Sequence, residues 1–166
     1  MASLELQQQL AAAVALRESG ATAAANQALV ELAAQYPDHA TVQYQCAWSF
    51  DVLGLESQAV PYYQRALAGT LTAPDRHGAF IGLGSTLRTL GRYAESATVF
   101  ENALAEFPDN AALRAFYAMT LHNLGRNAQA IQLLLHTLAD TSADSEVMQY
   151  RKALHFYAPQ LDRIWS

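Results

Sequence analysis

The chain has 166 residues, of which 52 % are apolar and 15 % are charged, and its formal net charge is −5. A chain of this length fits one ordinary domain, and this apolar fraction is sufficient to bury a continuous core. Nearly all of the positive charge is arginine, because Lys152 is the sole lysine, and acidic residues outnumber basic ones. The balance argues against nucleic acid and against anionic lipid as partners, since both require a clustered basic face.

The N-terminal segment predicts a helix from about residue 4 rather than a targeting signal. Its first charge is the acidic Glu5 and its apolar residues fall on one helical stripe. A secretory signal would instead open with basic residues before an unbroken apolar run. No segment is long and apolar enough for a membrane span. We therefore expect a cytoplasmic location without membrane contact, and the alanine-rich, lysine-poor composition favours a bacterial source.

Four glycines divide the chain, because each follows one helical run and precedes another: Gly20, Gly54, Gly91 and Gly125. They lie 34, 37 and 34 residues apart, so the period is about 34 with one insertion of three residues. This period predicts helix–turn–helix repeats. The paired helices are expected at about 4–18 and 21–35, 39–53 and 57–69, 75–90 and 93–106, and 109–124 and 127–140.

Other positions repeat in register with these glycines. The residue five positions later is always small, as close helix crossing requires: Ala25, Ala59, Ser96 and Ala130. The residue nine positions later is always large and apolar: Leu29, Tyr63, Phe100 and Leu134. Prolines in QYPDHA, TAPDRH and EFPDNA separate the repeats, and the following Asp38, Asp75 and Asp109 are predicted N-caps of the next helices.

The segment after Ser142 predicts one further helix at about 145–158, followed by a short tail to residue 166. Its apolar residues keep helical spacing, which is typical of a helix that caps the open end of a repeat array. The other side of this helix carries Met148, Phe156 and Trp165, which a purely solvated cap would not need. The single cysteine, Cys46, excludes an intramolecular disulfide and a cysteine-based zinc site, and we expect it to be buried.

This pattern resembles the tetratricopeptide repeat (TPR) family over nearly the whole chain. The third repeat is the clearest copy, with Phe80, Leu83, Gly84, Leu87, Gly91, Tyr93, Phe100, Ala103, Leu104 and Pro108 at the expected offsets. The resemblance implies an all-α fold, a right-handed α-solenoid that forms a single domain over residues 1–166. Its four units would span about 6–39, 40–76, 77–110 and 111–144, with the C-terminal helix as a cap.

In this family the first helix of each unit lines a concave face that holds a peptide. Carried over to this chain, the resemblance predicts a peptide-binding groove formed by Tyr44, Trp48, Ile81, Ser85, Arg88, Met119, His122 and Gln149. The best-known variant clamps a chaperone-tail carboxylate with a lysine and an asparagine, where this chain has Leu10 and Val14, so that specificity is not expected. An alternative stays open: Trp48 and Tyr44 pack against the neighbouring first helix or under the C-terminal tail.

Nothing in the sequence favours catalysis. The five histidines are spread over different repeats without metal-ligand spacing, and Gly78, Gly82 and Gly84 lie inside a predicted helix with no strand before it. We therefore expect no metal, no cofactor and no enzyme activity. The leading hypothesis is an adaptor or scaffold that binds a protein or peptide in the groove. Its competitor is a homodimer through Phe156, Tyr157 and Trp165 of the C-terminal segment, because exposed aromatic residues suit a symmetric interface.

Overall fold

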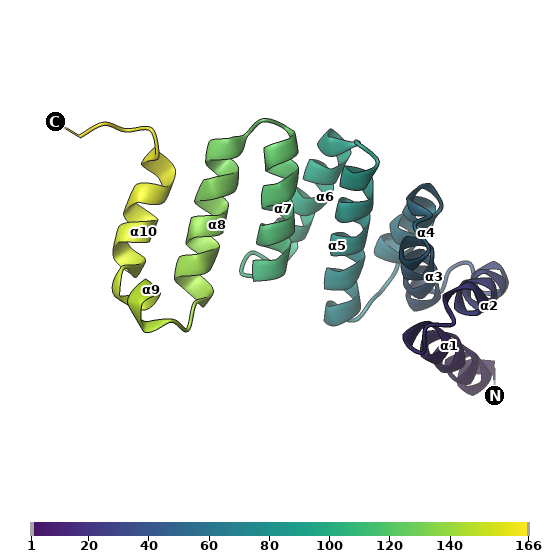
Figure 1. Ribbon diagram of the computed structural model, residues 1–166. Coiled ribbons are helices and arrows are strands. Elements are labelled where there is room, and N and C mark those ends of the chain that lie inside the picture. The colour runs from purple at the N-terminus through teal and green to yellow at the C-terminus, as the bar shows by residue number, and fades with distance from the viewer. Residues whose placement is uncertain (1, 166) are drawn as a thin grey trace. The chain divides into compact units, whose positions relative to one another are not determined.

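The structure is a computed structural model that describes residues 2–165, with side chains from Leu4 onward. The described residues form helices only (Figure 1). In chain order the helices are α1 (Ala2–Glu18), α2 (Thr22–Gln35), α3 (Ala40–Val52), α4 (Glu56–Ala68), α5 (Ala73–Thr89), α6 (Tyr93–Glu106), α7 (Ala111–Asn123), α8 (Asn127–Thr141), α9 (Ser145–Gln149), α10 (Arg151–Tyr157) and the 3-10 turn η1 (Ala158–Gln160). These bounds confirm the predicted pairs to within a few residues.

The period of about 34 residues comes from the turns between paired helices. Gly20, Gly54, Gly91 and Gly125 all have positive φ, between 69° and 89°, a conformation that favours glycine. In the first turn the N–H of Ala21 donates to the carbonyl of Leu16 at 2.9 Å, which closes the end of α1. This bond, five residues back along the chain, is the Schellman arrangement that satisfies the last carbonyls of a helix. Gly20 is therefore fixed by backbone geometry.

The predicted N-caps are wrong by one residue in two helices. The cap of α3 is His39, whose Nδ1 accepts a hydrogen bond from the N–H of Val42 at 3.3 Å, and the cap of α7 is Asn110. Asp38 and Asp109 lie one position earlier, in the turn after the proline. The cap of α5 is Thr72 rather than Asp75, because α5 begins before the proline that was expected to precede it. Proline fits the first turn of a helix, where its missing N–H has no intrahelical acceptor.

The helices group into two compact units, residues up to Gly91 and residues from Arg92 onward. In the first unit α1 to α5 pack each against the next, and in the second unit α6 packs on α7, α7 on α8 and α8 on α10. Both units use the repeated positions as their core: Ala25, Ala59, Ser96, Leu29 and Phe100 are completely buried. Cys46 is also completely buried, as predicted, and burial raises the pKa of its thiol to about 12.

The C-terminal segment differs from the single capping helix that the sequence predicts. It forms two short helices, α9 and α10, with a break at Tyr150. The break lets α10 lie along α8, where Arg151 Nη2 and His155 Nε2 reach Asp140 Oδ1 at 3.1 and 3.0 Å. Arg114 of α7 contacts the other oxygen of the same carboxylate at 3.2 Å. Asp140 therefore fixes α10 to the α7–α8 hairpin.

Within residues 2–165 no helix is long and apolar enough to cross a membrane.

Candidate functional site

Trp48 of α3 is one of the residues predicted to line the groove, and 42 % of its surface is exposed. The guanidinium carbon of Arg17, at the end of α1, lies 3.9 Å from the centre of the Trp48 ring. This is a cation–π contact. One face of the Trp48 ring therefore packs on Arg17, while part of the side chain is open to solvent.

Arg17 is unusual because it is charged and only 8 % exposed. Its Nη1 donates one long hydrogen bond of 3.5 Å to the carbonyl of Gln45, and no carboxylate within the described part of the chain forms an ion pair with it. Burial lowers the pKa of the Arg17 guanidinium. A largely buried guanidinium that makes a single long hydrogen bond among the described residues is an arrangement that an added carboxylate would stabilise.

Tyr44 was predicted to line the groove, but the structure shows it 7 % exposed beneath the surface. Its hydroxyl lies so close to Gly78 of α5 that a Cβ at that position would overlap it. Its ring centre is 5.9 Å from that of Trp48 and 6.3 Å from that of Tyr63. Tyr44 therefore packs against α5, a neighbouring first helix, whereas Trp48 contacts Arg17 of α1 and still keeps 42 % of its surface exposed.

The partly buried carboxylate of Asp51 ties α3, α4 and α5 together. Asp51 Oδ2 accepts a 2.6 Å hydrogen bond from the Tyr63 hydroxyl, and its Oδ1 accepts one of 2.9 Å from Thr86 Oγ1. Burial raises the pKa of Asp51, and both hydrogen bonds oppose the shift. Since Asp51, Tyr63 and Thr86 belong to α3, α4 and α5, the face around Trp48 is a fixed platform rather than a mobile loop.

The other predicted residues of the first unit lie on α5. Ile81, Ser85 and Arg88 stand ten, six and three residues before Gly91, which is the register of Tyr44, Trp48 and Asp51 before Gly54. All three are partly buried, and the buried Ser85 Oγ has no hydrogen-bond partner among the described residues. Because α5 packs against α3, these side chains share the platform of Trp48.

Three predicted groove residues belong to the second unit. Met119 of α7 is 39 % exposed, and His122 is exposed with its Nδ1 at 2.9 Å from Asn127 Oδ1. Met119 and His122 repeat the register of Trp48 and Asp51 on their own hairpin. Gln149 ends α9 and is exposed. Among the described residues of the second unit, no charged side chain is as deeply buried as Arg17.

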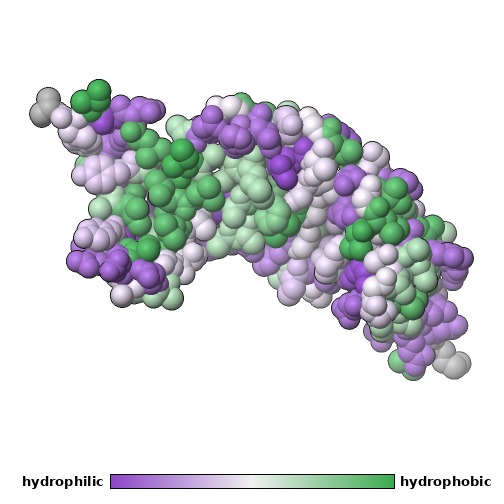
Figure 2. Space-filling model, viewed as in Figure 1, coloured by the Kyte–Doolittle hydropathy of each residue, from purple (hydrophilic) through white to green (hydrophobic). Residues whose placement is uncertain are grey.

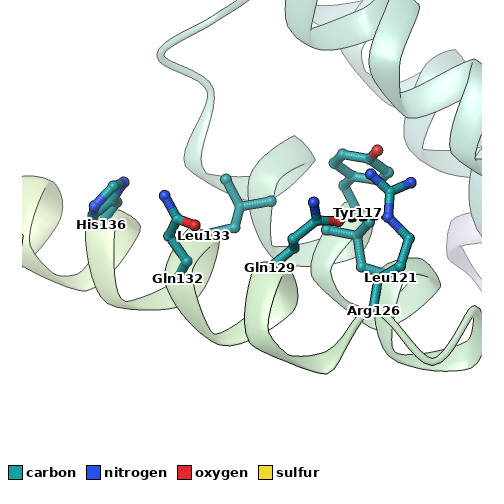
Figure 3. A pocket seen from close by; sticks show the side chains of 7 residues that line it. All are labelled: Tyr117, Leu121, Arg126, Gln129, Gln132, Leu133 and His136. Atoms are coloured by element: carbon teal, nitrogen blue, oxygen red, sulfur yellow. Dashed lines mark hydrogen bonds between the residues drawn. The ribbon is translucent and has the colours of Figure 1, made fainter. Parts of the chain in front are cut away.

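A pocket of about 200 Å³ lies on the α7–α8 hairpin, and the sequence analysis did not anticipate it. Figure 3 shows Gln129, Gln132 and His136 along one side of α8, with Tyr117, Leu121, Arg126 and Leu133 completing the lining. The Tyr117 hydroxyl donates to Glu101 Oε1 at 2.6 Å, and burial and this hydrogen bond raise the pKa of Tyr117 to about 12. Arg126 Nε donates to Gln129 Oε1. Tyr117 and Arg126, two of the polar residues of this lining, therefore already have hydrogen-bond partners.

The three residues predicted for self-association do lie together. Ring centres are 5.1 Å apart for Phe156 and Tyr157 and 5.5 Å apart for Phe156 and Trp165. Each ring is about half exposed, at 51 %, 52 % and 49 % for Phe156, Tyr157 and Trp165. The Arg163 guanidinium lies 3.9 Å from the Trp165 ring centre. The C-terminal aromatic cluster is therefore a real surface feature of the second unit.

No group of three or more His, Cys, Asp or Glu side chains within residues 2–165 is placed to hold a metal ion.

Comparison with known proteins identifies the family. A family model described as tetratrico peptide repeat matches residues 39–161. An uncharacterized protein of Aquifex aeolicus (strain VF5) is 41 % identical over 63 residues, which are 38 % of this chain and only 8 % of that much longer protein. The solved structure MamA MSR-1 C2 has a TM-score of 0.69 and 19 % identity and covers 87 % of this chain and 77 % of its own. MamA 41-end from Desulfovibrio magneticus RS-1 has a TM-score of 0.68 and 18 % identity, with 92 % and 88 % covered.

These structures are similar in fold, which confirms the predicted all-α solenoid of helix–turn–helix units. The family model covers most of the chain, from the start of the second repeat into the C-terminal segment. The protein is therefore a member of the tetratricopeptide repeat family.

Proposed function

We propose that this chain is a non-enzymatic adaptor that binds a polypeptide segment on the first-helix face of α1, α3 and α5. The segment carries an apolar side chain that packs on Trp48 and an acidic side chain that reaches Arg17. One observation carries this proposal: Trp48 is 42 % exposed although it covers an arginine that is 8 % exposed and lacks a carboxylate partner.

The energetics support an acidic partner. Burial of a guanidinium without a counter-charge is unfavourable, and a carboxylate from a partner would add charge-assisted hydrogen bonds at that point. Tryptophan and arginine are also the residue types that contribute most to binding interfaces. The platform under Trp48 is already fixed by Tyr44 and Asp51, so little conformational entropy is lost when a partner binds.

In the second unit, Met119 and His122 occupy the same register on α7 and are proposed to contact a partner there, together with Gln149. A flexible methionine suits an apolar contact of variable shape. These positions offer weaker anchoring than Trp48, since none of them stacks on a buried charge.

Selection of peptides from a random library tests the proposal. The wild-type protein should enrich peptides that combine an aromatic or branched apolar residue with Asp or Glu, and Trp48→Ala should abolish the enrichment. Trp165→Ala is the matched control, because Trp165 is 49 % exposed and lies in the other unit. Arg17→Gln should retain the apolar preference and lose the acidic one. The proposal would be contradicted if Trp48→Ala protein enriched the same peptides, or if the peptides that the wild type enriches contained no Asp or Glu.

A homodimer through the C-terminal aromatic cluster is the second candidate, favoured by the three half-exposed rings that contact one another. It predicts a dimer in light scattering that Phe156→Ala converts to a monomer while Trp48→Ala does not. A dimer that survives Phe156→Ala would reject it.

A further inference from the structure

Each hairpin has a trailing face, formed by the residues six, nine and thirteen positions after its glycine. On α4 these are Val60, Tyr63 and Leu67, and on α6 they are Ala97, Phe100 and Leu104. Val60, Tyr63, Ala97 and Phe100 are at most 6 % exposed, because the first helix of the following hairpin packs over them. The trailing face is therefore the surface through which one repeat stacks on the next.

The trailing face of α8 is not covered in this way. Its residues Ile131, Leu134 and Leu138 are 47 %, 46 % and 45 % exposed. Helix α10 packs on a different side of α8, where the rings of His136 and His155 lie 4.9 Å apart. Figure 2 shows apolar side chains gathered on the side of α8 and α10 that faces the viewer. The expected capping segment thus leaves this stacking surface open.

Each hairpin also has a leading face, formed by the residues twelve, eight and five positions before its glycine. On α3 and α7 these positions are at most 9 % exposed, and they are Val42, Cys46 and Ser49, and Leu113, Tyr117 and Thr120. They contact the preceding hairpin: Asn26 Nδ2 donates to Ser49 Oγ at 2.9 Å, and the hydroxyls of Ser96 and Thr120 are 2.9 Å apart. The leading face receives the trailing face of the previous repeat.

On α1 the leading face is exposed, and two of its three residues are alanines. Its residues are Gln8, Ala12 and Ala15, all exposed. Beside Ala12 an open slot of about 290 Å³ runs between α1 and α2, with Leu16 and Leu32 among its lining residues. The described chain therefore has one uncovered trailing face with three bulky aliphatic residues and one uncovered leading face with two alanines and a glutamine.

We infer that a second copy of this chain fills these surfaces, with the trailing face of α8 in one molecule stacked on the leading face of α1 in the next. The contact would continue between molecules the stacking that each chain uses internally. The aliphatic side chains of Ile131, Leu134 and Leu138 in one molecule would pack on Ala12 and Ala15 of the next. This inference goes beyond the peptide-binding proposal and uses different residues. A contact between two unlike surfaces is heterologous, so it joins molecules head to tail, in open chains or closed rings, rather than in a symmetric dimer.

Two charge substitutions test the inference. Leu134→Glu places a charge on the trailing face of α8, and Ala12→Glu places one on the leading face of α1. Their matched controls are Leu124→Glu, at an exposed leucine of the same hairpin as Leu134, and Ala23→Glu, at an exposed alanine of α2. Light scattering of the wild type and of both controls should show a mass that rises with concentration above that of the 18.1 kDa chain. Each face variant alone should remain at the mass of one chain.

Mixing the two face variants gives the decisive result. Each retains one intact face, so an equimolar mixture should form a complex of twice the single-chain mass that does not grow further. This outcome also proves that both variants are folded. A wild type that stays at single-chain mass at every concentration would overturn the inference. Three other results would also overturn it: Ala12→Glu protein that still associates, a mixture of the two face variants that does not form the complex, or association that is abolished by Phe156→Ala alone.

Discussion

Replacing Gly82 with alanine sets two effects of opposite sign against each other. Gly82 lies inside α5, where alanine stabilises a helix by about 1 kcal/mol relative to glycine. A Cβ at this position, however, would overlap the Tyr63 ring and hydroxyl of α4. Tyr63 is 2 % exposed and its hydroxyl donates to Asp51 at 2.6 Å, so the ring has no free space into which to move.

The clash should outweigh the gain in helix propensity. Overpacking a core costs about 1–3 kcal/mol. Displacing Tyr63 would also break its hydrogen bond to the Asp51 carboxylate, which is worth about 1.5–3 kcal/mol. After subtraction of the helix propensity term, Gly82→Ala should lower the free energy of unfolding by about 1.5–5 kcal/mol. In a Tyr63→Leu background the overlapping atoms are gone, and the same substitution should be neutral or stabilise by up to about 1 kcal/mol.

Urea unfolding followed by the fluorescence of Trp48 measures both values in protein carrying Trp165→Phe, since Trp48 lies on α3, which packs against α4. The reasoning fails if Gly82→Ala stabilises the protein when Tyr63 is present. It fails equally if the effect of Gly82→Ala is the same in both backgrounds, because then Tyr63 is not the neighbour that decides it.

Three further predictions follow from the same contacts. Leu29→Ala should lower the free energy of unfolding in urea by about 2–5 kcal/mol, because Leu29 is completely buried. Leu134 has the same register but is 46 % exposed, so Leu134→Ala should lower it by about 1 kcal/mol or less. Equal losses would contradict the open face of α8. Burial raises the pKa values of Tyr63 and Tyr117, so their contribution to stability should be fully present below pH ~10 and should be lost as the pH rises towards the folded pKa values. A thermal unfolding midpoint that does not change between about pH 8 and pH 11 would contradict this. Hydrogen bonds from Arg151, Arg114 and His155 lower the pKa of Asp140, so the docking of α10 on α8 should be lost as the pH falls through that lowered pKa. Asp140→Asn should likewise speed amide hydrogen exchange in residues 151–157. Unchanged exchange would show that other contacts hold α10.

The sequence predicted the elements that depend on local chemistry. The four turn glycines have the positive φ that no other residue adopts readily, and their spacing therefore revealed the paired helices and the buried positions around Leu29 and Phe100. The N-caps were misplaced because several polar residues follow each proline, and only the backbone geometry decides that His39 rather than Asp38 accepts the hydrogen bond.

Features that depend on packing between helices were harder to predict. The resemblance placed Tyr44 and Trp48 on one face, but whether each is buried or exposed depends on which helix covers it. Tyr44 lies beneath the surface because Gly78 leaves room for its hydroxyl, and the sequence analysis missed the contact of Trp48 with the buried Arg17. The apolar spacing after Ser142 likewise predicted a helix but could not indicate the side of α8 on which it packs.

Titration of a selected peptide into Trp165→Phe protein, in which Trp48 is the sole tryptophan, tests the binding proposal most directly. The peptide should cause a saturable shift of Trp48 emission. Arg17→Gln should weaken the binding of a peptide with an acidic residue by about tenfold, which corresponds to about 1.4 kcal/mol. The binding of the analogue with an amide in place of the carboxylate should be unchanged. Saturable binding that leaves the emission of Trp48 unaltered, or an Arg17→Gln effect that is equal for both peptides, would contradict the account.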